Sequence, residues 1–383
     1  MSTEKDTNNK NESDFKINLS DNNNIVTSDF DNNKSNDNSS KENLENIERL
    51  CSSKEMIIKS RVRLARNLAC YPFPTKMNSE QAKEIVQKVK SIFIKEDSLT
   101  NEFEFYDMNT LDKLSKINLV EEHLISPDLS EKADAGVLIN KDKNVSIMIN
   151  EEDHIRIQAI CDSDSIYEAY EIANKYDEII EKNLEYAFDP YLGYLTSCPT
   201  NVGTGIRASA MIHLSAISQL KYINEMYKIL AKIGMTMRGI YGERSEALGN
   251  IYQISNQLTL GKTEKEIVEL LYNITGSIVD KEKQARDLLE ESRGIEYEDK
   301  IFRSLGILLN SRVINTKEAM EHLSNLKTGI SLGLIKPLEA GYLDRLTIDI
   351  QPAHQSIMSK DSNLKSRDAN RARYIRESLK QLN

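Results

Sequence analysis

The chain has 383 residues, 39% of them hydrophobic, which is enough apolar material for about two domains of ordinary size. Its 60 acidic residues outnumber its 50 Lys and Arg residues, and the formal net charge of −10 argues against nucleic acid as a partner. No run approaches the roughly 18 apolar residues of a membrane-spanning helix, and the N-terminus lacks the hydrophobic segment of a signal peptide, so we expect a cytoplasmic protein with no membrane partner.

The first 46 residues differ in composition from the rest. They contain thirteen asparagines among Asp, Ser and Lys, and their isolated apolar residues form no periodic face. Such a segment buries too little apolar surface to offset the entropy lost on ordering, so it is predicted to be a disordered tail.

The next region alternates between helical and strand patterns. A capping residue at Ser79 precedes apolar residues at helical spacing, which predicts a helix. Alternating apolar residues predict strands at 103–106 and 145–149. Helices and strands are therefore mixed in this region.

After residue 261 the pattern becomes helical. Thr263 and Glu266 form a capping-box pattern, and apolar residues recur behind them at helical spacing. Further helices are predicted at 316–323 and 367–382. Breaks are predicted at Gly329, Gly333 and Pro337.

These patterns divide the chain into three regions. We predict a tail at 1–46, a mixed domain at 47–262 and a helical domain at 263–383. The four cysteines contain no C-x-x-C pair, which predicts free thiols and no metal site built by the protein. They are Cys51, Cys70, Cys161 and Cys198.

The segment 147–156 is the most informative. An alternating apolar strand ends in Glu151, Glu152 and Asp153, followed by His154 and Arg156. Strand ends often carry functional side chains, but a solvated acidic turn would show the same composition. Because alternation points His154 away from its acidic neighbour, a structural role is expected for it.

A second segment, 196–210, is a loop of small residues with two glycines and Arg207. Such a loop lets backbone N–H groups approach an anion. It lacks the G-x-x-x-x-G-K-[ST] pattern, and the alternative interpretation is a tight turn before a helix.

Two further segments carry arginines. Arg61 and Arg63 alternate with apolar residues, so in an extended conformation both project from one face. Two parallel guanidinium groups suit phosphate oxygens. Residues 237–244 contain Arg238, Glu243 and Arg244. Each segment alone would also fit a surface cluster of salt bridges.

Together the four segments supply what phosphoryl transfer to a guanidine requires. At an effective dielectric near 20, each Arg at about 4 Å from a phosphate charge contributes roughly 4 kcal/mol before desolvation. A guanidinium has a pKa of about 12.5 or above, so making it nucleophilic at neutral pH costs at least ~7 kcal/mol, which a closely held carboxylate offsets. Alignment and charge neutralisation by Mg²⁺ then carry most of the catalysis.

Three motifs occur in order: Ser-Arg-Val-Arg at 60–63, Asn-Glu-Glu-Asp-His-x-Arg at 150–156 and Cys-Pro-Thr-Asn-x-Gly-Thr-Gly-x-Arg-Ala at 198–208. They resemble the guanidino (phosphagen) kinase superfamily, and the segments 122–127, 193–205 and 245–257 are similar to its bacterial protein arginine kinase branch. The resemblance covers about residues 48–383. It implies an α+β fold with an antiparallel sheet flanked by helices, followed by a helical C-terminal domain.

The resemblance also implies roles for individual residues. Glu152 and Glu243 match the carboxylates that grip and activate the acceptor guanidinium, with Glu151 and Asp153 in support. Cys198 matches a reactive cysteine beside that guanidinium, and a plain buried thiol is the alternative. The residues implied for ATP binding are Ser60, Arg61, Val62, Arg63, His123, Arg156, Arg207, Ala208, Ser209, Ala210, Met211, Arg238, Gly239, Ile240, Tyr241 and Gly242.

A C-terminal motif resembles the family motif that is associated with a second pocket, which binds phosphoarginine and regulates the enzyme. It comprises Arg367, Asp368, Arg371 and Ala372. A charged helix face is the alternative, because Asp368 and Arg371 at i, i+3 would pair in any case.

The branch implies an ATP-dependent kinase that acts with Mg²⁺ on protein substrates with exposed arginines. It further implies a homodimer, an activator protein, and an ATP-dependent protease that removes marked proteins in stress. The rival interpretation is a small-molecule phosphagen kinase, which carries an additional helical N-terminal domain where this chain has its Asn-rich tail. A third interpretation is a non-catalytic adaptor protein that binds phosphoarginine.

Two positions depart from the family pattern. Lys59 stands where Ser is usual, and Arg244 follows Glu243 where a small residue is common. Among the remaining histidines, His213 is expected to pack in a core, and no ligand-spaced partner is evident for His322 or His354.

Overall fold

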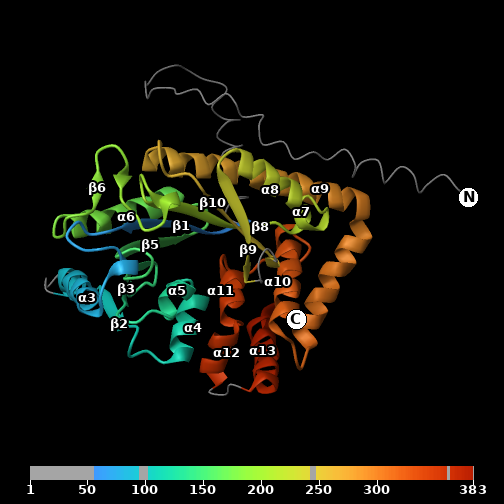
Figure 1. Ribbon diagram of the computed structural model, residues 1–383. Coiled ribbons are helices and arrows are strands. Elements are labelled where there is room, and N and C mark those ends of the chain that lie inside the picture. The colour runs from blue at the N-terminus through green and yellow to red at the C-terminus, as the bar shows by residue number, and fades with distance from the viewer. Residues whose placement is uncertain (1–55, 95–101, 242–246, 360–362, 383) are drawn as a thin grey trace, which may run out of the picture.

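The computed structural model describes residues 56–94, 102–241, 247–359 and 363–382 (Figure 1). The predicted tail at 1–46, Cys51 and the segment 242–246 with Glu243 lie outside the described residues. In the part of the chain that is described, no helix is long and apolar enough to span a membrane.

An eight-stranded sheet forms the centre of the fold, and all its neighbouring strands are antiparallel. Its order is β2-β3-β4-β5-β1-β8-β10-β9 (Figure 1). The strands are β1 (Ile57–Arg66), β2 (Phe103–Asp107), β3 (Gly136–Asn140), β4 (Val145–Ile149), β5 (Ile155–Asp162), β8 (Ile206–His213), β9 (Met235–Tyr241) and β10 (Ala247–Asn256). The predicted α+β class and the strands predicted at 103–106 and 145–149 are confirmed.

One alternative interpretation is wrong. Residues 206–213, which would have begun a helix if the preceding loop were a simple turn, form β8. This strand pairs on both sides, with β1 and with β10, and its side chains are almost all buried. The run of apolar and small residues therefore reflects a central strand covered on both faces.

The strand register divides the sheet into two faces. Val62 pairs with Ala208, and both are fully buried in the main hydrophobic core. The next pair along β1 and β8 is Arg63 with Arg207, which lies on the opposite face because side chains alternate along a strand. The arginines therefore project from the face opposite the main core.

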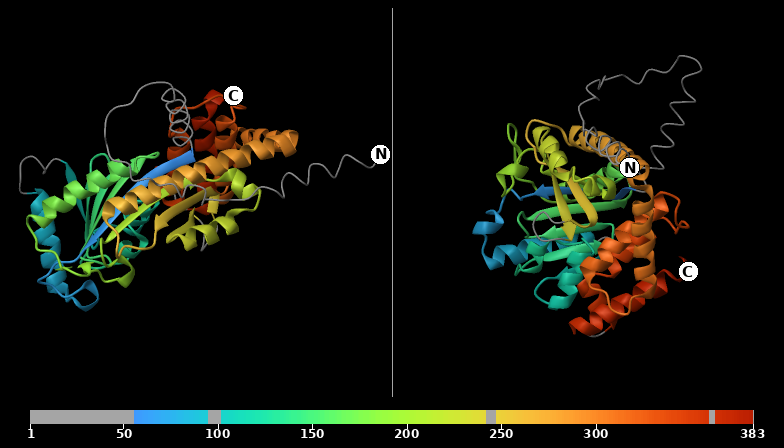
Figure 2. Two further views of the ribbon diagram at one scale, coloured as in Figure 1. Left: turned by 90° about the horizontal axis from the view of Figure 1, so that it is seen from above. Right: turned by 90° about the vertical axis from the view of Figure 1, so that its right-hand side faces the viewer.

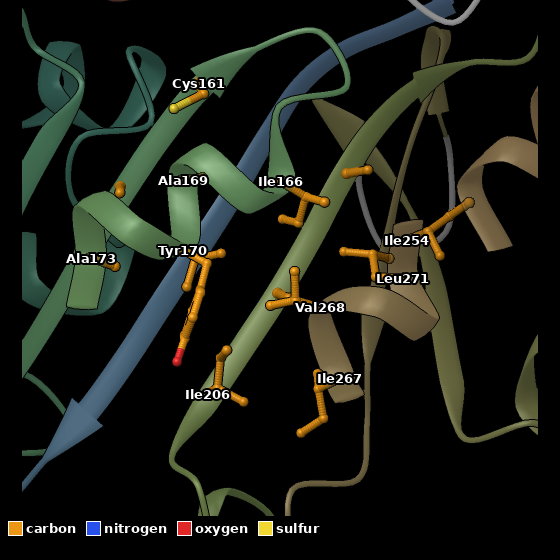
Figure 3. Packing of buried hydrophobic residues seen from close by; sticks show 14 of the residues in the cluster. Cys161, Ile166, Ala169, Tyr170, Ala173, Ile206, Ile254, Ile267, Val268 and Leu271 are labelled. Carbon is orange, nitrogen blue, oxygen red and sulfur yellow. The ribbon is translucent and has the colours of Figure 1, made fainter. Parts of the chain in front are cut away.

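Helices cover the main core. They are α3 (Ser79–Ile94), α6 (Ile166–Glu181), α7 (Ser215–Gln219), α8 (Ile223–Lys232) and the first half of α9 (Glu264–Asn310). Figure 3 shows Ile206 of β8 beside Tyr170 of α6, with Ile267 and Val268 of α9 nearby in the same cluster. The helix predicted at Ser79 is confirmed.

Two groups of helices pack on the arginine face and meet where α4 contacts α12. The short helices α4 (Lys113–Glu121) and α5 (Pro127–Ser130) form a small apolar cluster with β3 and β4. Among the C-terminal helices, α10 (Thr316–Ser331), α11 (Tyr342–Asp349) and α13 (Leu364–Ser378) share an apolar cluster with β8, β9 and β10, whereas α12 (Pro352–Ser359) packs against α4 and α13 (Figure 2). In the order of the sheet, β5 and β1 lie between the strands covered by the first group and those covered by the second.

The long helix α9 connects the main hydrophobic core with the C-terminal apolar cluster. The predicted capping box forms, with Thr263 and Glu266 bonding reciprocally. Arg293 departs from helical geometry (φ −137, ψ 26), and the helix bends there (Figure 1). Residues before the bend join the main core, whereas Ile301 and Leu308 join the C-terminal cluster. The boundary near residue 262 stays a prediction.

The break predicted at Gly329 is wrong, because this residue lies inside α10. A Cβ at Gly329 would lie 2.4 Å from Ile301 Cγ2, so the glycine permits close packing of α10 on α9. Gly333, two residues beyond the helix, has φ +72 and does mark its end.

Glu282 on α9 is a buried anchor. Its carboxylate accepts hydrogen bonds from the backbone N–H groups of Ala216 (2.9 Å) and Ile217 (3.0 Å) and pairs with Arg286 Nε at 3.0 Å. Without it, α7 and a buried guanidinium lose their acceptor. We expect Glu282→Ala to lower the free energy of unfolding by about 3–5 kcal/mol in urea titrations.

The exposed Glu290 on the same helix is the matched control. Glu290→Ala should change the free energy of unfolding by no more than about 0.5 kcal/mol. Equal stability of the two variants would contradict the anchoring role of Glu282.

Candidate functional site

Five arginines lie on one face of the sheet. Arg61 and Arg63 come from β1, Arg156 from β5, Arg207 from β8 and Arg238 from β9. The strand pairing brings them together, because Arg63 pairs with Arg207 and Arg156 pairs with Ala65, two positions further along β1. Four strands that are distant in sequence thus build one cluster of guanidinium groups.

The cluster has more positive charge than its neighbours neutralise. Burial lowers the pKa of Arg63 well below its ordinary value, and the four other guanidinium groups lower it further. Burial likewise lowers the pKa of Arg207, with Arg238 and Arg156 adding to the effect. These like charges repel one another in the absence of a bound anion.

Two arginines of the cluster have buried N–H groups that are available to donate hydrogen bonds to a ligand. The Nε atoms of Arg63 and Arg207 are buried and have no hydrogen-bond partner among the described residues. Unpaired buried donors are uncommon in native proteins. Together with the excess charge, they fit an anion with several oxygens, such as the phosphates of a nucleotide.

Neutral side chains of β10 orient the arginines. Gln253 Oε1 accepts hydrogen bonds from Arg61 Nη2 (2.7 Å) and Arg238 Nη2 (3.2 Å), and Ser255 Oγ accepts one from Arg207 Nη2 (3.1 Å). They hold the guanidinium groups without cancelling their charge. Gln253 is not among the site residues predicted from the sequence, and its only sequence signal is its place in an alternating strand.

Acidic residues lie at the edge of the cluster, in the turn between β4 and β5. Arg156 pairs with Glu151 at 2.5 Å and with Glu152 at 3.0 Å. Glu151 is buried and also accepts a hydrogen bond from Ser126 Oγ (2.6 Å), whereas the Glu152 side chain is 44% exposed. Glu152 is thus the member of the acidic triplet that an incoming molecule can reach.

Asp153 joins this turn to the loop that carries Cys198. Its Oδ1 accepts hydrogen bonds from Asn67 Nδ2 and from the Ser197 backbone N–H, both at 2.7 Å. Cys198 is half-buried, with its Sγ 3.0 Å from Thr200 Oγ1. Cys198 and Glu152 both interact electrostatically with the Arg207 guanidinium, so the Cys198 side chain lies near the cluster.

Several of the arginines, together with Glu152, surround a cavity of about 180 Å³. It is lined by Arg63, Ala65, Glu152, Arg156, Asn201, Gly205, Arg207 and Arg238. A second cavity of about 210 Å³ shares Asn201 and Arg207 with it. Cations therefore lie on one side of this space and an accessible carboxylate at its edge.

His123 lies at the other end of the cluster. Burial lowers its pKa to about 3, and Arg61, Lys59 and Arg238 add to the effect, so the ring is neutral at pH 7. Its main chain has φ +62, and its carbonyl accepts a hydrogen bond from Gln158 Nε2 (2.8 Å). Lys59, one of the departures noted above, pairs weakly with Asp162 at 3.8 Å.

Several residues implied for nucleotide binding do not point their side chains at the cluster. Ser60, Val62, Ala208 and Ala210 face the main core, and Ser60 Oγ donates to Ser163 O at 2.8 Å. Met211 and Ile240 join the C-terminal apolar cluster. Ser209 shares the arginine face with Arg61, and Gly239 and Tyr241 lie on β9. Gly242, Glu243 and Arg244 lie outside the described residues.

Two histidines have structural roles, as expected. His154 Nδ1 accepts a hydrogen bond from the Leu68 N–H (3.0 Å), and Nε2 contacts Pro72 O (3.0 Å). His213 is buried, with Nε2 2.7 Å from Ser324 Oγ. No partner for His354 was evident from the sequence. Its Nε2 lies 3.4 Å from Asp349 Oδ1, because the short connection between α11 and α12 brings the two residues together.

The buried histidines predict a loss of stability in mild acid. Burial lowers the pKa of His123, His154 and His213 in the folded state, while the ordinary value is 6.5. Below pH 6.5 the unfolded chain therefore binds more protons, and the free energy of unfolding falls as the pH falls. Above that pH these groups contribute no pH dependence. Urea midpoints should be lower at pH 5 than at pH 7, and equal midpoints would contradict this assignment.

The C-terminal motif divides into buried and accessible members. Arg371 is fully buried, and its guanidinium donates to Ile350 O (2.8 Å), Ile314 O (3.0 Å) and Asp368 (2.5 Å). Ala372 lies in the C-terminal apolar cluster. Arg367 and Asp368 are only partly buried. Arg371 therefore holds α13 in place, and Arg367 is the cation of the motif nearer to solvent.

Glu121 connects this region with the sheet. Its carboxylate accepts hydrogen bonds from the N–H groups of Ala353 (2.9 Å) and His354 (3.0 Å) at the start of α12. Burial raises the pKa of Glu121, while the two amides and the charges of His354 and Arg367 oppose this. Glu121 therefore joins α4, which packs on β3 and β4, to the start of α12.

Known protein families account for nearly all of the described chain. The ATP:guanido phosphotransferase C-terminal catalytic domain matches residues 84–285, and the Protein-arginine kinase McsB C-terminal domain matches residues 294–383. A protein-arginine kinase from Caldanaerobacter subterraneus subsp. tengcongensis is 45% identical over 329 residues, 85% of this chain and 97% of that relative. The chain belongs to the protein-arginine kinases of the ATP:guanido phosphotransferase family.

Other members of the family agree. A protein-arginine kinase from Bacillus cereus is 46% identical over 328 residues, 85% of this chain and 93% of that relative. Among solved structures, the duplicated taurocyamine kinase from Schistosoma mansoni has 24% identity and a TM-score of 0.54 over 66% of this chain and 37% of its own. Lombricine kinase has 22% identity and a TM-score of 0.50 over 63% of this chain and 68% of its own. Both support the guanidino kinase fold.

Proposed function

We propose that the protein transfers the γ-phosphate of ATP to the guanidinium groups of arginine side chains in other proteins. The observation that carries this proposal is the cavity that holds Arg63, Arg207 and Arg238 beside the accessible carboxylate of Glu152. Cations suit the donor phosphates and a carboxylate suits an acceptor guanidinium, so one space fits both reactants. The names of the relatives, protein-arginine kinase, support protein as the acceptor.

The arginine cluster would bind the nucleotide phosphates. Each unpaired Nε donor in the cluster gains an acceptor when a phosphate oxygen enters, and the repulsion between guanidinium groups is relieved. His123, neutral and close to Arg61, would contact the nucleotide at the far end. Mg²⁺ would arrive with the phosphates and neutralise the charge that develops during transfer.

Glu152 would orient the acceptor guanidinium and receive its proton as the nitrogen attacks phosphorus. Its exposed position at the edge of the cation cluster suits this role, and Arg156 fixes the carboxylate. Glu243 is proposed as the second carboxylate on sequence resemblance alone. Cys198, tied to the Glu152 turn through Ser197 and Asp153, is proposed to adjoin the acceptor.

A small-molecule phosphagen kinase would use the same chemistry on a free guanidino compound. The two functions differ in the acceptor, so the test compares initial rates of ADP release with free arginine and with a disordered arginine-containing protein such as β-casein. The proposal predicts turnover with β-casein and little with free arginine. Turnover with free arginine alone would overturn it.

We also propose that residues near Arg367 bind phosphoarginine and regulate the kinase. Arg367 Nε is buried with no hydrogen-bond partner among the described residues, which suits an anionic ligand. Arg367→Ala should weaken phosphoarginine binding at least about tenfold, the effect of losing a charge-assisted hydrogen bond, and leave ATP affinity unchanged. Isothermal titration with each ligand measures both, and unchanged phosphoarginine affinity would contradict the assignment.

The remaining proposals rest on family membership. The helical region 263–383 would form a homodimer, and the kinase would act in the cytoplasm. By labelling damaged or regulatory proteins in stress, it would deliver them to an ATP-dependent protease, with an activator protein as a further partner. Size-exclusion chromatography with light scattering tests the dimer.

A further inference from the structure

Five large apolar side chains are exposed on the two segments that flank the Cys198 loop. They are Phe188 (57% exposed), Tyr191 (93%), Leu192 (48%), Leu258 (56%) and Leu260 (57%). We call these five residues the apolar rim. Single exposed apolar residues are ordinary, but a concentration of them around one loop of a soluble protein marks an interaction surface.

One side of the rim is a rigid hairpin. It comprises β6 (Phe188–Asp189) and β7 (Gly193–Tyr194), and it projects from the body of the fold (Figure 1). Asp189 Oδ1 accepts hydrogen bonds from the N–H groups of Tyr191 (2.8 Å) and Leu192 (2.9 Å), which fixes the tip. The backbone that carries Tyr191 is therefore held in an ordered turn, so little backbone entropy is lost when the tip binds a partner.

The other side of the rim packs against the Cys198 loop itself. Thr259 Oγ1 lies within hydrogen-bond distance of two carbonyls, Thr200 O (2.9 Å) and Val202 O (2.7 Å), which share its single hydroxyl hydrogen. Gly203 approaches so closely that a Cβ there would lie 2.6 Å from Thr259 O and 2.9 Å from Leu260 Cα. Leu258 and Leu260 are thus fixed beside the loop.

The hairpin connects to the candidate acceptor site through a short chain of hydrogen bonds. Tyr194 N–H donates to Gly203 O (2.8 Å), and Asn67 Nδ2 donates both to Leu195 O (3.1 Å) and to Asp153 (2.7 Å). Asp153 is the neighbour of Glu152. Ser197, which also bonds Asp153, is six positions along the chain from Tyr191, so at about 3.3–3.6 Å per residue the tip lies within roughly 20 Å of that point.

An arginine side chain is short, so the polypeptide that carries a target arginine must run over the surface close to the acceptor site. A disordered segment of about six residues spans roughly 20 Å when extended. Such segments also expose apolar side chains that folded proteins bury. We propose that the apolar rim binds apolar residues flanking the target arginine in an unfolded polypeptide; this inference rests on the proposed function.

The test uses the full-length double variant Tyr191→Ser, Leu260→Ser with two acceptors, β-casein and the tripeptide Gly-Arg-Gly. Losing the rim contacts should raise the KM for β-casein about tenfold, the scale of losing an aromatic contact of an interface. The KM for the tripeptide and the affinity for ATP should stay unchanged. Ile295→Ser is the matched control, because Ile295 is 84% exposed on α9 and lies outside the rim.

An unchanged KM for β-casein in the double variant would overturn the inference. So would an equal rise in KM for both acceptors, because the rim would then act on the acceptor site rather than on flanking residues. An equal effect of Ile295→Ser would show a nonspecific surface contribution and would also overturn it. If the unmodified protein phosphorylates neither acceptor, the proposed function fails, which is a different outcome from any of these.

Discussion

Replacing Glu152 with glutamine is expected to lower kcat for arginine phosphorylation about 10³-fold, within the range lost when a general base is removed. Glutamine keeps the size of the side chain but has no charge to orient a guanidinium or to accept its proton. Arg156 retains Glu151 at 2.5 Å, so the turn should hold its shape. Single-turnover kinetics at saturating ATP measure the chemical step.

ATP affinity should change little in Glu152→Gln, because the carboxylate lies at the acceptor edge of the cavity. Glu131→Gln, at an exposed position after α5, is the matched control and should retain full activity. Full turnover by Glu152→Gln would refute the role proposed for this carboxylate. If the loss of activity came entirely from weaker ATP binding, Glu152 would act on the nucleotide and not on the acceptor guanidinium.

Arg207→Ala is expected to raise the dissociation constant of ATP about 10- to 100-fold, the effect of losing one or two charge-assisted hydrogen bonds. The same substitution should leave the ligand-free protein as stable as before or more stable. The lowered pKa of Arg207 means that its charge is unfavourable in the folded state, chiefly through burial and through Arg238 and Arg156. A loss of affinity without a loss of stability is typical of a residue placed for a ligand.

Thermal unfolding with and without ATP separates these effects. The unmodified protein should gain stability with ATP, whereas Arg207→Ala should gain much less at the same concentration. Arg303→Ala is the control, since Arg303 is an exposed arginine on α9 that pairs with Asp299. If Arg207→Ala unfolded at a lower temperature and bound ATP normally, Arg207 would be a structural residue.

Local features of the fold were predictable because they depend on nearby residues. The capping box at Thr263, the helix at Ser79 and the short strands at 103–106 and 145–149 are each specified by side-chain spacing within a few residues. The order of the sheet was not predictable, since β1 pairs with β5 and β8, about 100 and 150 residues further along. Gly329 misled the prediction because its role is to admit Ile301 from another helix.

The site was predictable as a set of charges but not as an arrangement. Alternation along β1 correctly placed Arg61 and Arg63 on one face. That Arg207 lies directly opposite Arg63 depends on the register between β1 and β8, which the sequence does not display. Gln253 was missed for the same reason, because it meets Arg61 across 192 residues of chain.

The most direct test of the proposed activity locates the transferred phosphate. The protein is incubated with ATP, Mg²⁺ and β-casein, and the casein is analysed by mass spectrometry at neutral pH, because a phosphate on a guanidinium nitrogen is labile in acid. Phosphate on arginine side chains, absent when Glu152→Gln replaces the unmodified protein, is the predicted result. Transfer of phosphate to serine, threonine or tyrosine of the casein instead of arginine would contradict it.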